Sequence, residues 1–189
     1  MKIDKLVLVS SNKNKAREVE RILEIPIEIK EIDLDEIQEL DLEKVALHKL
    51  NQAFEIVKSP VIIDDVSFEV EEWKGFPGPL IKWLLKASGG DNANVMLKML
   101  DGVSDRSAVA KLAVGFHDGK TARVFIGESK GIVATEIRGD NGFGWDPVFI
   151  PEGYDQTFAQ MTPSEKDKIS HRGRALAKLH DFIRENYEL

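Results

Sequence analysis

The stretch SAVAKLAVGFHDGKTARVFIGESKGIVATEI, residues 107–137, decides the fold class of this 189-residue chain. Its apolar side chains come in runs that the turn HDGK interrupts at residues 117–120, and an Asp-Gly pair between such runs is typical of a β-hairpin. The stretch predicts three strands, at residues 107–116, 120–129 and 130–137, joined as an antiparallel meander. We therefore expect a β-sheet at the centre of the molecule.

Helices alternate with further strands on the N-terminal side of this meander. KLVLVS (residues 5–10) has the pattern of a buried strand, and a polar turn leads from it into a helix over KAREVERIL, residues 15–23. PIEIKEI (26–32) alternates like a half-exposed strand, and VIIDDVSFEV (61–70) has the composition of a buried one. A second helix lies between them, with an apolar face formed by Leu42, Val45, Ala46, Leu50, Ala53 and Phe54.

Three more helices complete the pattern. LIKWLLKA (80–87) and NANVMLKML (92–100) predict short amphipathic helices, and SHRGRALAKLHDFIREN (170–186) predicts a final helix. Strands and helices are therefore mixed along the chain around a central sheet, which indicates an α/β fold. We expect a single folding unit, because 189 residues are too few for two large independent domains.

Composition and charge exclude several classes of function. Hydrophobic residues make up 42% and charged residues 31% of the chain, the balance of a globular protein. A net charge of -7 repels polyanions, so we expect no nucleic-acid partner, although a few lysines can hold a small anion. The chain has no cysteine, which excludes disulfides, thiolate metal sites and cysteine nucleophiles. The apolar run LVLVS is too short for a secretion signal or a membrane span, so we expect a cytoplasmic protein without a membrane partner.

The polar turn SSNKNKAREVE, residues 10–20, is a candidate anion-binding site. A turn that opens a helix offers free backbone N–H groups and the positive end of the helix dipole, and Ser11, Asn12 and Asn14 are candidate caps. Three cations add positive charge to this turn: Lys13, Lys15 and Arg17. The alternative is a capped helix with solvated lysines. The sequence lacks GxxxxGK[ST], which excludes a Walker P-loop.

Two acidic groups are candidate metal ligands. DEIQE, residues 35–39, precedes the second helix, and Asp64 and Asp65 follow the apolar run VII of a strand. Adjacent strand residues point to opposite faces, so we expect only one of the two aspartates to face a given cleft. A carboxylate at a strand end beside a second one from a loop is a common way to hold Mg²⁺. The alternative for Glu36 and Glu39 is a solvated approach to the helix.

The glycine-rich loop RGDNGFGWDPVFIPEGY, residues 138–154, suits a flat ligand. Its glycines let the backbone approach a ring edge, and Phe143 and Trp145 supply flat apolar surface for a nucleobase. The alternative is a turn whose aromatic side chains fill the core. Farther along, Ser170 is a candidate N-cap of the final helix. The histidine and arginine after it then lie where a cation opposes the helix dipole, and a ligand contact explains that placement.

In this order the segments resemble the inosine triphosphate pyrophosphatase family, and the resemblance runs nearly from end to end. SSNKNKAREVE resembles the family's TGNxxKxxE, DEIQE resembles PEIQG, and DDVSF with KGFPGPLIKW resembles ED(T/S)GL with GxPGxY. RGDNGFGWDPVF resembles RGxxGFG(Y/W)DPxF, and SHRGRAL resembles SHRxxAL. Each motif is weak by itself, but five in the same order are highly specific.

The resemblance implies a reaction and a fold. The reaction is Mg²⁺-dependent hydrolysis of ITP, dITP or XTP between the α and β phosphates, which gives the nucleoside monophosphate and pyrophosphate. The fold is an elongated, two-lobed α/β structure, a mixed sheet flanked by helices with the nucleotide cleft between the lobes. The resemblance also implies a homodimer.

The resemblance assigns roles to individual residues of the site. The triphosphate is lined by Ser10, Ser11, Asn12, Lys13, Asn14 and Lys15, and phosphate or sugar is contacted by Lys49 and Lys82. The base pocket, which reads the 6-oxo group that adenine lacks, consists of Phe143, Gly144, Trp145, Asp146, Lys166, His171 and Arg172. Lys15 and Asp65 are implied as catalytic, and Glu36 and Asp65 as metal ligands, with Glu18 near them.

Three residues depart from the family's pattern. Ser11 replaces a glycine of the phosphate loop, and Asp64 replaces a glutamate, whose side chain is longer. Val66 stands at a substrate-binding position where the family has Thr or Ser, and the neighbouring Ser67 faces the other side of the strand. These departures leave two alternatives open, a related hydrolase with altered base preference and a nucleotide-binding protein without catalysis. Whether Asp65 is a base or a metal ligand is also open.

Overall fold

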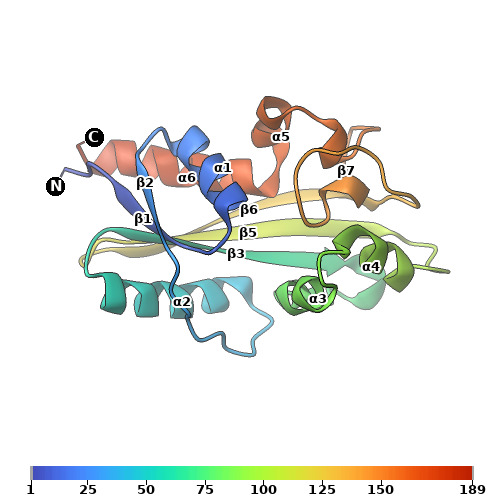
Figure 1. The fold of residues 1–189 in the computed structure, drawn as a ribbon, viewed down its shortest axis with the longest axis horizontal. Helices are drawn as coiled ribbons and strands as arrows, with labels where there is room; N and C mark the ends of the chain where they lie inside the picture. Colours follow the sequence, from blue (N-terminus) through green and yellow to red (C-terminus); the bar gives the residue numbers. More distant parts are fainter. Residues whose placement is uncertain (1, 189) are drawn as a thin grey trace.

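The structure, a computed structural model, describes residues 2–188 and contains a seven-stranded mixed sheet (Figure 1). The strands lie in the order β2-β1-β3-β5-β6-β7, and β4 pairs with β3 beside this row. Strand β1 pairs with β2 and β3 in parallel, and the pairs from β3 through β5 and β6 to β7 are antiparallel. The strands are β1 (Leu6–Val9), β2 (Ile27–Lys30), β3 (Val61–Val70), β4 (Pro77–Gly78), β5 (Ser107–His117), β6 (Ala122–Val133) and β7 (Phe149–Pro151).

Helices cover both faces of the sheet. Figure 1 shows α1, α5 and α6 on one face and α2 and α3 on the other, with α4 beside α3. The helices are α1 (Lys13–Leu23), α2 (Leu42–Val57), α3 (Ile81–Ala87), α4 (Asn92–Met99), α5 (Pro163–Ile169) and α6 (His171–Asn186). Within residues 2–188, none of these helices combines the length and the apolar character that crossing a membrane requires. The predicted α/β fold, a mixed sheet flanked by helices, is confirmed.

Three apolar clusters join the layers. One packs α1 and α6 against the sheet around Leu8 and Leu179, and a second packs α2 against the opposite face around Leu50. The third lies at the other end of the molecule, under α3 and α4, and includes Phe68 and Trp145. The long strands β3, β5 and β6 connect these two ends, which makes the molecule elongated in Figure 1. Strand β3 is buried along almost its whole length because helices cover both of its faces.

The predicted meander is confirmed at its hairpin and wrong in its third strand. Strands β5 and β6 pair along their full length around the turn at residues 118–121. Strand β6 then continues unbroken through Gly131, where we predicted a separate strand at residues 130–137. A Cβ atom on Gly131 would lie 2.2 Å from the carbonyl oxygen of Ile150. This glycine therefore marks the close approach of β7 to β6 and does not interrupt the strand.

Side-chain caps begin the helices that carry the candidate site. The Asn12 side chain accepts hydrogen bonds from the backbone N–H groups of Asn14 and Lys15, so α1 begins at Lys13, two residues before the predicted start. The Ser170 side chain accepts a hydrogen bond from the N–H of Gly173 and caps α6 as predicted. Both caps satisfy helix N–H groups that would otherwise lack a partner.

Gly127 lets α6 lie directly against β6. A Cβ atom at this position would be 2.1 Å from the carbonyl oxygen of His171 and 2.4 Å from the backbone nitrogen of Ala175. Both atoms belong to the helix backbone, which cannot move aside without displacing the start of α6. The glycine thus determines how the first turn of this helix sits on the sheet.

Gly127→Ala is therefore expected to lower the free energy of unfolding by about 1–3 kcal/mol, the usual cost of overpacking a core. Urea denaturation measures this change. The matched control is Gly115→Ala on β5, where the new Cβ would meet flexible side-chain atoms of Leu50 and Ile63 at 3.1 to 3.2 Å. An equal loss in both variants would contradict the role assigned to Gly127.

Candidate active site

A cavity of about 780 Å³ lies among residues from both helix layers and from the edge of β3. Its volume is within the range of sites that bind small molecules, roughly 300–1,000 Å³. It is lined by most of the predicted site residues: Ser10, Ser11, Asn12, Lys15, Glu36, Lys49, Asp65, Val66, Lys82, Phe143, Gly144, Trp145, Asp146, His171 and Arg172. These residues come from widely separated segments of the chain, and the fold brings them together.

The cavity exists because one edge of β3 is only partly paired. Strand β1 pairs with β3 at residues 61–62, and β4 pairs with it again at residues 68–69. Within residues 2–188, no strand pairs with this edge between those two points. Both Asp64 and Asp65 line the cavity, so our expectation that only one would face it is wrong. The cavity extends around the free edge, and side chains from both faces of β3 reach it.

Asp64 lies on the α1 and α6 side, between two cations. Lys15 Nζ donates to its Oδ1 at 2.7 Å, and Arg172 Nη2 donates to its Oδ2 at 3.1 Å. Burial opposes ionisation of Asp64, but the charges of Lys15 and Arg172 outweigh it and lower the pKa of Asp64 to about 2. Asp64 is therefore ionised and holds the side chains of Lys15 and Arg172 in place.

Asp65 lies on the α2 side and shares a lysine with Glu36. Lys49 Nζ donates to Asp65 Oδ1 and, at 2.9 Å, to Glu36 Oε1, and Lys82 from α3 also contacts Glu36. Burial raises the pKa of Asp65, although Lys49 opposes the shift. The second oxygen of Asp65, Oδ2, is buried without a hydrogen-bond partner. The two carboxylates thus converge on one ammonium group, and Asp65 Oδ2 is left without a partner.

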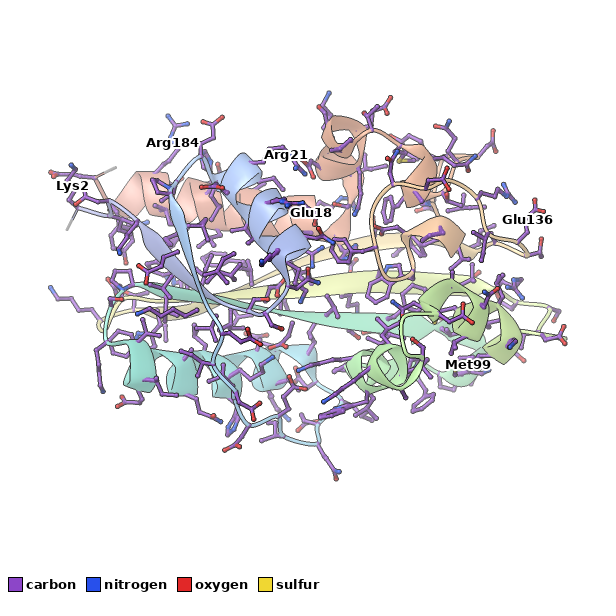
Figure 2. All side chains as sticks on the ribbon, in the orientation of Figure 1. Lys2, Glu18, Arg21, Met99, Glu136 and Arg184 are labelled. Carbon is purple, nitrogen blue, oxygen red and sulfur yellow. The ribbon has the colours of Figure 1, made fainter. Side chains whose placement is uncertain are left out.

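Ion pairs also connect α1, α5 and α6 at the other end of the cavity. Glu18 of α1 (Figure 2) accepts from Lys166 Nζ at 3.1 Å and from Arg172 Nη1 at 2.9 Å. Lys166 Nζ also donates to Asp146 Oδ2 at 2.7 Å, and the backbone N–H of Phe143 donates to that same oxygen. Glu18, which we expected near the metal ligands, therefore contacts residues of the predicted base pocket.

Aromatic side chains form the wall at this end. Trp145 is 5% exposed and packs on Phe68, with ring centroids 4.9 Å apart, so it belongs to the core and also borders the cavity. The ammonium of Lys166 and the guanidinium of Arg172 lie 5.1 and 5.4 Å from the centroid of the Phe143 ring. The ring centroids of His171 and Trp145 are 5.8 Å apart. Both alternatives for the loop therefore hold in part, since its aromatics fill the core and line the cavity.

The comparison with known proteins identifies the family. The model of the Ham1 family matches residues 6–182 of this chain. The chain belongs to the Ham1 family. A dITP/XTP pyrophosphatase of Saccharolobus solfataricus is 40% identical over 182 residues, which cover 95% of this chain and 93% of that protein.

Two further Ham1 relatives extend the similarity. An inosine triphosphate pyrophosphatase of Fusarium vanettenii is 43% identical over 189 residues, which cover 98% of this chain and 99% of that protein. The solved structure of a Ham1 protein from Coxiella burnetii has a TM-score of 0.80 at 26% identity and covers 97% of this chain and 100% of its own. The resemblance inferred from the motifs is confirmed.

The cavity of this Ham1 chain excludes some predicted residues and includes others that the motifs did not indicate. Lys13 and Asn14 are exposed on the first turn of α1 and do not line it. Lys166 does not line it either, but contacts the lining residues Asp146 and Phe143. The lining residues that we missed include Glu31, Ile32, Asp33, Leu34, Lys86 and Asn92. These residues lie outside the motifs quoted above. The only feature of the sequence that pointed to any of them is the high density of acidic residues before α2.

His171 is buried as a neutral imidazole. Burial, followed by the charges of Arg172 and Lys166, lowers its pKa well below the ordinary value. In the unfolded chain this histidine takes up a proton as the pH falls through about 6.5, whereas the folded protein stays neutral there. The unfolded state then binds more protons, so acidification below about pH 6.5 destabilises the fold by about 1.4 kcal/mol per pH unit for this group.

His171→Gln is expected to remove this contribution. Between pH 6.5 and 5, the free energy of unfolding should fall less steeply with decreasing pH in the variant than in the wild type. The difference between the two slopes should be about 1.4 kcal/mol per pH unit, the value for one proton. Urea denaturation at several pH values measures both slopes. Equal slopes would show that His171 takes up its proton equally in the folded protein.

Proposed function

We propose that this chain hydrolyses deaminated purine nucleoside triphosphates such as ITP, dITP and XTP to the monophosphate and pyrophosphate. The observation that carries the proposal is one cavity with cations and carboxylates at one end and an aromatic pocket at the other. The names of the Saccharolobus and Fusarium relatives, at 40% and 43% identity, support it. From the family resemblance we also infer a homodimer that acts in the cytoplasm without a nucleic-acid partner.

The end of the cavity near β1 and α1 has the charge and the donors to hold a triphosphate. Ser10, Ser11, Asn12 and Lys15 border it, and Lys13 and Asn14 lie beside them on the first turn of α1. Lys49 and Lys82 supply positive charge from α2 and α3. Phosphate oxygens of a bound triphosphate can replace the carboxylates as partners of these ammonium groups, because they are strong acceptors for charged donors.

Glu36 and Asp65 fit a Mg²⁺ ion. The oxygen Oδ2 of Asp65 is buried without a partner, and both carboxylates already surround one positive charge, that of Lys49. Within residues 2–188 no group of three or more acidic or histidine side chains is arranged around a metal position. Two carboxylates suffice for Mg²⁺, which keeps water and phosphate oxygens as its other ligands. When bound, Mg²⁺ supplies charge neutralisation for the phosphates.

The chain's own groups then perform the remaining steps. Asp65 Oδ2 accepts a proton from, or orients, the water that attacks the α phosphate. Lys15 stabilises negative charge on the phosphates, and Asp64 keeps Lys15 and Arg172 in position. The leaving group is pyrophosphate, which departs with the oxygen that bridged the α and β phosphorus atoms.

The aromatic end explains a preference for a 6-oxo purine. Trp145 Nε1 and Arg172 Nε are buried without hydrogen-bond partners, and His171 is neutral and lines the same pocket. These groups include donors, which pair with a carbonyl oxygen but not with the exocyclic amine of adenine. Each lost bond to a buried donor costs roughly 1–3 kcal/mol. Adenine nucleotides are therefore rejected.

Pyrophosphate release from ITP, XTP, dUTP, GTP and ATP in the presence of Mg²⁺ tests the proposal. We expect ITP and XTP to be the best substrates and ATP the poorest. Val66 borders the cavity, so equal rates on GTP and ITP would favour a related hydrolase with altered base preference. Tight binding of ITP without turnover would instead favour a nucleotide-binding protein.

A further inference from the structure

One of the cations that line the cavity forms no ion pair with a carboxylate. The cations that line the cavity are Lys15, Lys49, Lys82, Lys86 and Arg172. All of them except Lys86 form an ion pair with a buried or partly buried carboxylate. Within residues 2–188, Lys86 has no carboxylate at ion-pair distance. Lys86 is an exposed residue that borders the cavity, and no carboxylate among the described residues neutralises its charge.

Lys82 and Lys86 form a pair on α3. They are four residues apart in a helix, so their side chains lie on the same face, one turn apart. Both ammonium groups lie near the ring of Trp83, 5.7 Å from its centroid for Lys82 and 5.3 Å for Lys86. Like charges at this spacing repel each other and slightly destabilise a helix. An anion with more than one charge between them would turn this repulsion into attraction.

The neighbours of Lys82 indicate which anion this is. Lys82 contacts Glu36, which also binds Lys49, and Lys49 binds Asp65. The lysine pair of α3 therefore adjoins the carboxylates at which the α phosphate is attacked in the proposed function. Lys86 lies one helical turn beyond Lys82, farther from those carboxylates along α3. Ribose and base, on one side of the α phosphate, are neutral, whereas the β and γ phosphates on its other side carry the negative charge that a second lysine attracts.

We infer that Lys86, together with Lys82, binds the β and γ phosphates of the substrate, and therefore the pyrophosphate product. Lys86 contributes charge to binding, and no bond to it forms or breaks. The inference rests on the proposed function and extends it, because neither the motifs nor the family resemblance assigns a role to Lys86. It predicts that Lys86 distinguishes triphosphates and pyrophosphate from monophosphates.

Binding of pyrophosphate, measured by calorimetry with Mg²⁺ present, tests the inference without catalysis. Lys86→Met removes the charge and keeps the length of the side chain. We expect it to weaken pyrophosphate binding about fivefold, a modest effect because the ion pair is exposed to solvent, and the difference should shrink at high salt. Lys86→Arg keeps the charge and should retain affinity. The matched control is Lys98→Met, an exposed lysine of α4 that does not line the cavity and should bind as the wild type does.

Kinetics on ITP and binding of IMP complete the test. Lys86→Met should raise KM for ITP about fivefold and leave the affinity for IMP unchanged. Unchanged pyrophosphate affinity in Lys86→Met, or an equal loss for IMP and pyrophosphate, would overturn the inference, and so would a wild type that does not bind pyrophosphate. A wild type that binds pyrophosphate through Lys86 but does not hydrolyse any purine triphosphate would overturn the proposed function alone.

Discussion

Asp65→Asn is expected to reduce pyrophosphate release from ITP by about 1,000-fold, within the range for loss of a general base. The substitution is nearly isosteric, and the amide oxygen can still accept from Lys49 as Asp65 Oδ1 does. The change falls on the other position, where the buried and unpartnered Oδ2 becomes an NH₂ group. That group can neither accept a proton from water nor bind a metal ion. Release of pyrophosphate in the presence of Mg²⁺ is the measurement.

The control for this variant is Asp181→Asn, which removes a carboxylate from an exposed side chain of α6. It should hydrolyse ITP at the wild-type rate. Binding of IMP to Asp65→Asn shows whether the base pocket is intact, and we expect it to be unchanged. If Asp65→Asn retains more than about a tenth of the wild-type rate, Asp65 does not act as a base or a metal ligand.

Lys49→Met is expected to lower the free energy of unfolding by about 3 kcal/mol in the absence of divalent ions, as breaking a buried ion pair does. Lys49, Glu36 and Asp65 each have side chains about one-tenth exposed, so little water can replace the lost ammonium group. Asp65 then has no cation in contact, whereas Glu36 keeps Lys82. Millimolar Mg²⁺ should restore more stability to this variant than to the wild type, because the ion takes the place of the ammonium charge.

Thermal or urea denaturation with and without Mg²⁺ measures both effects. Lys44→Met is the matched control, since it removes an exposed lysine from the same helix. It should change the free energy of unfolding by no more than about 0.5 kcal/mol and leave the response to Mg²⁺ unaltered. Equal stabilisation of Lys49→Met and the wild type by Mg²⁺ would mean that Glu36 and Asp65 do not form the metal site.

Several elements were predictable because they depend on neighbours in the chain. The caps at Asn12 and Ser170 involve backbone groups at most three residues away. In the sequence they are indicated by a polar residue directly before a segment whose apolar residues recur at helical spacing. Strand β3 coincides with the predicted residues 61–70 because apolar runs of this length are typical of strands buried on both faces. The error at residues 130–137 arose at Gly131, which is a glycine because β7 comes close and not because the chain turns.

The site itself depends on contacts between residues far apart in the chain. Glu18 meets Lys166 and Arg172 across 148 and 154 positions, and no pattern of spacing relates these residues. The alternation of a strand correctly put Asp64 and Asp65 on opposite faces. It did not reveal that the cavity extends around the free edge of β3 and receives both carboxylates. Lys86 carried no signal at all, because its importance comes from the cavity it lines.

Residue order alone therefore settles most of the helices and the long strands, the caps at Asn12 and Ser170 and the motifs that the chain offers, since helical period, strand alternation and capping act over a few residues. The fold in three dimensions decides which charges meet. Asp64 pairs with Lys15 and Arg172, and Asp65 with Lys49, because β1 and β4 leave the middle of one β3 edge unpaired and the helix layers supply a different set of cations on each side of it.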